Sequence, residues 1–247
     1  MNARPMQIAT SPLAPPGNSR SLRNCGGQSD RQDGWVKAGL PALFAALIFT
    51  AAGPVRADSY ADFNRAIATD DATTVARLLE RGMDPNTVNE KGEPALLTAA
   101  REGSPAVVKA LLRARVKVNV KNGYGDTAIM VAALGGHLAV VKLLREAGAE
   151  INHPGWTALQ YAAINGHDAV IEYLLSSGAD LALVAPNGVT PLMLAVHANK
   201  ADTVKLLIGY GFDVSARNDK GETALAWAQR QEYKDIEQIL RRAGAKE

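Results

Sequence analysis

The stretch Asp126–Asn152, DTAIMVAALGGHLAVVKLLREAGAEIN, decides the fold, because its apolar residues recur at the spacing of two short helices joined by a turn. The same pattern returns in Thr157–Asp180, TALQYAAINGHDAVIEYLLSSGAD, and in Thr190–Asp213, TPLMLAVHANKADTVKLLIGYGFD. Weaker copies lie on both sides of these three units. A recurring unit of this size predicts a repeat protein whose units stack on one another.

Glycine positions measure the period. One series lies two residues before a Thr or Pro that we expect to open a helix, with spacings of 33, 30, 33 and 33 residues: Gly92, Gly125, Gly155, Gly188 and Gly221. A second series follows the last apolar helix of each unit: Gly82, Arg115, Gly148, Gly178, Gly211 and Gly244. Helices commonly end on a left-handed residue, usually glycine. Arg115 is the exception, and we expect it to cost roughly 1–2 kcal/mol if it adopts that conformation.

The units resemble the ankyrin repeat, whose signature is T-P-L-H-x-A with a period of about 33 residues. The resemblance spans 59–244 and is carried by Thr190-Pro191-Leu192 and by the pairs Gly136-His137 and Gly166-His167. It implies an all-α solenoid of helix-turn-helix units with short β-turn fingers. The glycine series divides the domain into six repeats, 59–91, 92–124, 125–154, 155–187, 188–220 and 221–247.

The sequence departs from the family pattern in two ways, and each departure predicts a local structural difference. The signature histidine is replaced in every unit, by Leu97, Met130, Gln160, Met193 and Ala226, so we expect different hydrogen bonding where the first helices begin. Only His153 and Pro154 separate Asn152 from Gly155, three residues fewer than in the other linkers. We therefore expect a short finger between the third and fourth repeats, and a notch in the row of fingers with Trp156 beside it.

The first 57 residues differ from the repeats. Residues 1–35 are polar, rich in Pro and Gly, and without apolar periodicity, so we expect them to be disordered. Residues 36–57 read as a signal peptide: Lys37, the apolar run AGLPALFAALIFTAAG, and small residues around Val55-Arg56-Ala57. Cleavage after Ala57 leaves residues 58–247 as the repeat domain, in the periplasm or secreted.

Alternatives to cleavage stay open. Residues 38–55 are just long enough for an uncleaved membrane anchor, although Pro41, Gly53 and Pro54 weaken that interpretation. A buried helix fits poorly because no repeat lies beside it in the sequence. The leader is also unusually long, and one hypothesis is that translation begins near Val36.

Charge and cysteine content limit the classes of partner and the compartments that fit the repeats. The whole chain has 27 basic and 25 acidic residues, and removal of residues 1–57 leaves 21 and 23, a net charge of −2. The repeats therefore carry no basic footprint for nucleic acid. Cys25 is the only cysteine and lies in the leader, so the repeats need neither a reducing compartment nor disulfides.

The family resemblance implies a protein partner, bound by the concave, finger-bearing face. The positions it assigns to the centre of that face are Tyr124, Asp126, Leu134, His153, Trp156, Ile164, Asn165, Asn187, Val189 and His197. The apolar members, with charged positions on either side, match the anatomy of an interface. The alternative, that Trp156 and Ile164 only cover neighbouring repeats, stays open.

The sequence offers no catalytic or cofactor motif. His137 and His167 occupy the Gly-His position and are interpreted as structural. His153 and His197 can approach each other near the short linker, but we identify no further ligands for a metal. No nucleophile elbow or phosphate loop is present.

We therefore predict a monomeric, non-enzymatic protein-binding module that meets the membrane only transiently through its signal peptide. It is similar to small periplasmic ankyrin-repeat proteins of Gram-negative bacteria. The alternatives are a secreted effector that binds a host protein and, below it, an enzyme accessory or metal-binding protein.

Overall fold

The computed structural model describes residues 57–246, so the predicted leader and signal peptide lie outside the described residues except for Ala57. The described part contains twelve helices, and the all-α prediction is confirmed. Their bounds are α1 Ala57–Ala68, α2 Ala72–Glu80, α3 Ala95–Arg101, α4 Pro105–Arg113, α5 Ala128–Leu134, α6 Leu138–Glu146, α7 Ala158–Asn165, α8 Asp168–Ser176, α9 Pro191–His197, α10 Ala201–Gly209, α11 Ala224–Arg230 and α12 Lys234–Arg242.

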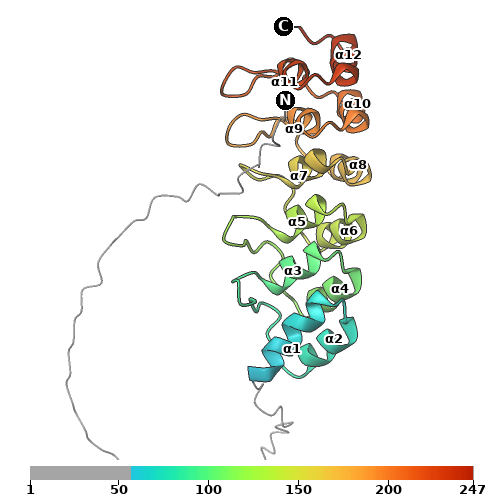
Figure 1. Cartoon of the computed structure of the whole chain (residues 1–247). Coiled ribbons are helices and arrows are strands. Elements are labelled where there is room, and N and C mark those ends of the chain that lie inside the picture. Colours follow the sequence, from blue (N-terminus) through green and yellow to red (C-terminus); the bar gives the residue numbers. More distant parts are fainter. Residues whose placement is uncertain (1–56, 247) are drawn as a thin grey trace, which may run out of the picture. The chain divides into compact units, whose positions relative to one another are not determined.

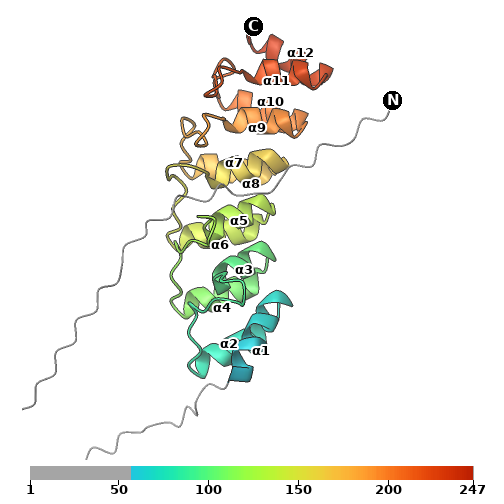
Figure 2. The same cartoon turned by 60° about the vertical axis from the view of Figure 1, so that its left-hand side comes forward.

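The helices stack as six consecutive pairs, in the order of the chain (Figure 1). The odd-numbered helices form an inner row, and the even-numbered helices form an outer row on the side away from the loops. Each loop that joins one pair to the next projects as a finger beside the inner row (Figures 1 and 2). We call the surface made by these fingers and the exposed side of the inner helices the finger face.

Threonine side chains fix where several inner helices begin. The hydroxyls of Thr157, Thr190 and Thr223 accept the backbone N–H three residues further on, at 3.4, 3.2 and 3.1 Å. In α7 the bonding is reciprocal, because the side-chain oxygen of Gln160 accepts the Thr157 N–H at 2.9 Å. This capping box satisfies donors that an isolated helix leaves unpaired. Gln160, which stands in place of the signature histidine, thus completes the cap of α7.

The substitution of the signature histidine is less well compensated in α5. There the sulfur of Met130 accepts the Thr127 N–H at 3.4 Å, while the Thr127 hydroxyl is buried without a partner. The expectation that hydrogen bonding differs at the helix starts is therefore confirmed.

Small buried residues let the inner helices approach closely. Ala132 and Ala133 in α5, and Ala162 and Ala163 in α7, are completely buried. One continuous apolar core runs from Phe63 in the first pair to the last. Because no pair can bury its apolar side alone, the stability of each pair depends on its neighbours.

Histidine side chains join successive pairs. The Nε2 atoms of His137 and His167 lie 3.0 Å from the carbonyls of Arg101 and Leu134, at the ends of the preceding inner helices. A carbonyl only accepts, so both rings carry a proton on Nε2. A Cβ on Gly103, in the preceding repeat, would lie 2.4 Å from the His137 ring. The histidines of the Gly-His pairs are therefore structural, as the sequence indicated.

Asparagine side chains form a second set of links. The side-chain oxygens of Asn86, Asn119 and Asn152 accept backbone N–H groups of the next finger at 2.9–3.0 Å. Asn119 and Asn152 also donate to the carbonyls of Gly148 and Gly178, at 3.2 and 2.8 Å. These bonds satisfy backbone groups that helix ends leave unpaired.

Arg115 adopts the left-handed conformation, with φ of 60°, at the position where the other five outer helices end in glycine. We expect Arg115→Gly to raise the free energy of unfolding by about 1 kcal/mol, because glycine has no Cβ to strain there. Urea unfolding followed by circular dichroism measures the change.

Gly148 is the matched control, because its φ is 89° and a Cβ there would meet no atom within 4 Å. Gly148→Ala should therefore lower the free energy of unfolding by about 1 kcal/mol through the backbone alone. Equal stability of Arg115→Gly and the natural protein would contradict the assignment of strain to Arg115.

Candidate partner-binding face

Three fingers are built around an asparagine. The side-chain oxygens of Asn89, Asn122 and Asn218 each accept two backbone N–H groups of their own finger, at 2.9–3.0 Å. Each of these three fingers is also closed by one isolated antiparallel β-bridge of its own. Such turns fix the finger tips without help from a neighbouring repeat.

The short loop before α7 lacks this arrangement. Asn152 uses its side chain to hold the next finger, and the ring Nδ1 of His153 bonds the Pro154 carbonyl at 2.7 Å. No bridge closes the loop within the described residues. The position directly after its glycine is filled by Trp156, where the asparagine fingers have an acid.

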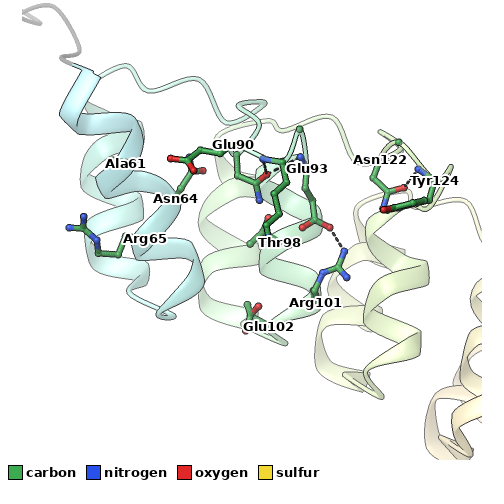
Figure 3. Close-up of a pocket in the computed structure, with 14 residues that line it drawn as sticks. Ala61, Asn64, Arg65, Glu90, Glu93, Thr98, Arg101, Glu102, Asn122 and Tyr124 are labelled. Atoms are coloured by element: carbon green, nitrogen blue, oxygen red, sulfur yellow. Dashed lines mark hydrogen bonds and ion pairs between the residues drawn. The ribbon is translucent and has the colours of Figure 1, made fainter. Parts of the chain in front are cut away.

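At the N-terminal end, the finger face contains an open groove of about 950 Å³ (Figure 3). Residues of α1, of the two nearest fingers and of α3 line it. Glu93 and Arg101 form an ion pair within it, drawn as a dashed line in Figure 3. The groove carries Arg65, Lys91 and Glu90 as well, so its charges are mixed in sign.

At the C-terminal end, Glu222 is the centre of a hydrogen-bonded cluster. Its carboxylate accepts from the side chains of Asn218 at 2.9 Å, Trp227 at 2.8 Å and Arg230 at 2.5 Å. These three donors lower the pKa of Glu222 to about 2. Arg230 also lies 6.0 Å over the indole ring of Trp227, within reach of a cation–π interaction.

The middle of the face is aromatic. Trp156 stacks on Tyr161, with ring centroids 5.4 Å apart and planes inclined by 24°. The Tyr161 hydroxyl donates to a carboxylate oxygen of Asp126, in the preceding repeat, at 2.7 Å. Burial and this bond to Asp126 raise the pKa of Tyr161. The stacked pair is therefore anchored across two repeats.

The predicted apolar centre is only partly exposed. Tyr124, at a finger tip, is 75% exposed, whereas Leu134, Trp156 and Ile164 are half-buried. The last two pack against the core, as the interpretation that they cover neighbouring repeats expects, and their role in binding stays a prediction. Val189 was expected on the surface but is buried at 4% exposure, because it is apolar and joins the core together with Ala185, which stands where three other fingers have asparagine.

The polar members of the predicted set have separate roles. Asn165 donates to the Leu134 carbonyl at 2.6 Å, which links the third and fourth repeats. Asn187 accepts the Asp219 N–H through its backbone carbonyl at 3.1 Å. His197 lies edge-on to Trp227, with centroids 5.7 Å apart, and its Nδ1 is 3.5 Å from the amide nitrogen of Gln231.

His153 and His197 do not form a joint site. His153 bonds within its own loop, whereas His197 contacts the sixth repeat. Within residues 57–246, no group of three or more His, Cys, Asp or Glu side chains is placed to hold a metal ion. Across the same span, none of the helices has the length and apolar character needed to traverse a membrane.

Tyr161 is the residue that sequence reasoning missed. It lies four positions after Thr157, and Trp227 lies four positions after Thr223, so two repeats carry an aromatic residue at one position of the unit. Both donate to a carboxylate on the finger face. Comparison of the repeats at that position is the signal that could have found it.

Stacked helix pairs with projecting fingers define a solenoid protein whose exposed face is extended. The ankyrin-repeat family model matches residues 63–154, 119–185 and 177–246, and the chain belongs to this family. Ankyrin repeats are typically protein–protein interaction modules and generally non-catalytic, and no enzyme family matches.

Two solved structures illustrate the similarity. The ankyrin repeat domain of human ASB11 is 27% identical, with a TM-score of 0.70, and the match covers 74% of this chain and 84% of that one. An ankyrin repeat domain from Acinetobacter baumannii AYE is 28% identical, with a TM-score of 0.66, and the match covers 76% and 100%. No curated protein sequence matches the chain.

The Glu222 cluster predicts a dependence of stability on acid. Its pKa is depressed from 4.5 to about 2 in the folded protein, so the cluster stabilises the fold above pH 4.5 and loses this effect as pH falls toward 2. Glu222→Gln should therefore lose less stability over that interval than the natural protein. Thermal melts at a series of pH values give the comparison.

Glu90→Gln is the control, because it makes the same change in charge at an exposed finger position. We expect its acid profile to follow the natural protein. If both variants show the natural acid dependence, the cluster does not set the acid stability.

Proposed function

We propose that the protein is an exported, non-enzymatic binding module that captures a protein partner on its finger face. The observation that carries the proposal is the arrangement along that face. Tyr124 is exposed at the tip of the finger before α5, Leu134, Trp156 and Ile164 are half-buried in the third and fourth repeats, and ion pairs lie in the second and sixth repeats. An apolar centre inside a polar rim is the pattern of interfaces whose binding energy is concentrated in a few aromatic residues.

The proposed location is the periplasm, or the exterior after further export. It rests on the order of a positive flank, an apolar run and small residues before Ala57. The proposed junction coincides with the first residue of α1, so cleavage after Ala57 leaves the twelve helices complete except for that residue. We also propose that the mature protein is a monomer.

Site-specific cross-linking tests the face. A photo-reactive phenylalanine replaces Tyr124 in the full chain expressed in its own cells, and the same residue replaces Tyr210 as the control. Tyr210 is 44% exposed but follows α10 in the outer row, away from the fingers. We expect a discrete adduct from position 124 and none of the same mass from position 210.

The same preparation tests export. N-terminal sequencing of the recovered protein should begin at Asp58, and fractionation should place it with the envelope contents. Identical adducts at both positions, or none at either, would contradict binding by the finger face. Protein that still begins at Met1 and lies in the cytoplasmic fraction would contradict export. The cross-links would then still test the binding face.

Tyr124→Ala with Trp156→Ala is the variant that connects the face to affinity. We expect capture to weaken by at least tenfold, since aromatic anchors at an interface are commonly worth 2 kcal/mol or more. Tyr124→Ala alone should leave the melting temperature unchanged, because its side chain is 75% exposed. Unaltered capture by the double variant would place the partner on another surface.

A further inference from the structure

One position of the repeat carries an acid that forms an ion pair in two repeats and, within the part of the chain that the structure describes, forms none in a third. The acid follows the finger glycine, and the residue eight positions later ends the inner helix. Glu93 pairs with Arg101 in the second repeat, and Glu222 pairs with Arg230 in the sixth. In the third repeat the acid is Asp126, but the residue eight positions later is Leu134.

The sixth repeat shows what the complete arrangement contains. Glu222 receives an asparagine amide, an aromatic N–H and a guanidinium, from Asn218, Trp227 and Arg230. The guanidinium also lies over the indole of Trp227. A planar guanidinium can bond a carboxylate and stack on an aromatic ring together, which an ammonium cannot reproduce.

Asp126 in the third repeat also accepts from an asparagine and an aromatic side chain, although the aromatic donor comes from the fourth repeat. Asn122 donates to one oxygen of Asp126 at 3.3 Å, and the Tyr161 hydroxyl donates to the other at 2.7 Å. Among residues 57–246, no ion pair includes Asp126. A carboxylate accepts about four hydrogen bonds, so capacity remains. Trp156 stacks on the ring of Tyr161, whose hydroxyl bonds this carboxylate.

We propose that Asp126, Tyr161 and Trp156 form a binding site for an arginine side chain of the protein partner. The inference rests on the proposed binding function and names the chemistry that the face recognises. The guanidinium bonds Asp126 and lies against the Trp156–Tyr161 pair, as Arg230 bonds Glu222 and lies over Trp227. Leu134 occupies the place from which an arginine of the chain itself would reach the acid.

The test needs no knowledge of the partner. N-acetylarginine amide is titrated into full-length protein labelled with ¹⁵N at tryptophan, and the indole N–H signals are followed by NMR. We expect a saturable shift of the Trp156 signal and none of the Trp227 signal, whose site Arg230 already fills. N-acetylcitrulline amide, with the same shape and no charge, should bind about two- to fivefold more weakly, as expected for the loss of one exposed ion pair.

Variants of the site separate charge from stacking. Asp126→Asn should remove the preference for arginine over citrulline. Leu134→Arg should abolish the response, because an arginine of the chain then fills the site. Arg230→Ala is the matched opposite case: it empties the sixth-repeat site, so the Trp227 signal should begin to respond to N-acetylarginine amide.

Three results would overturn the inference: no saturable shift of Trp156, equal half-saturation by arginine and citrulline, or equal half-saturation by N-acetyllysine amide. The outcome is independent of the cross-linking experiment. Cross-links at position 124 without arginine binding would leave the binding face standing and remove the arginine site. Arginine binding without cross-links at position 124 would support the arginine site and contradict partner binding by the finger face.

Discussion

The structure depends on links that run from the side chains of one repeat to the backbone of its neighbour. A helix of seven to nine residues leaves as many backbone groups unpaired as it pairs, and short isolated helices are unstable in water. His137 and His167 bond the carbonyls at which the preceding inner helices end. Asn119 and Asn152 bond the loops that follow the outer helices. These links fix the register in which the apolar sides meet.

The same frame allows the finger face to vary. Positions committed to links or to the alanine contacts between inner helices cannot change without disturbing two repeats. The position after the finger glycine is not restricted to one kind of contact, and it holds Glu93, Asp126, Trp156, Val189 and Glu222 in successive repeats. Its side chain forms an ion pair, an aromatic stack or part of the core. Specificity can therefore change at these positions while the stack stays intact.

The period, the helix pairs and the left-handed Arg115 could all be predicted from the sequence, because they follow from local patterns repeated six times. The burial of Val189 was not predicted, although Ala185 stands four positions before it where three other fingers have asparagine, and both side chains join the core. Tyr161 was missed because its hydroxyl reaches Asp126, 35 residues away, in another repeat. Contacts between repeats are invisible to periodicity within one repeat.

The links between repeats are not uniform along the stack. Ala182 stands where the preceding fingers have asparagine, and Lys200 stands where the third and fourth repeats have histidine. The Lys200 stem occupies the space that a Cβ on Gly166 would need, which a histidine ring fills elsewhere. The fifth repeat instead meets the fourth through apolar burial and a bond of 2.5 Å from Thr203 to Asp168. Since links to helix ends satisfy groups that apolar contact cannot, we expect the boundary between these repeats to open at lower free energy than the two boundaries before it.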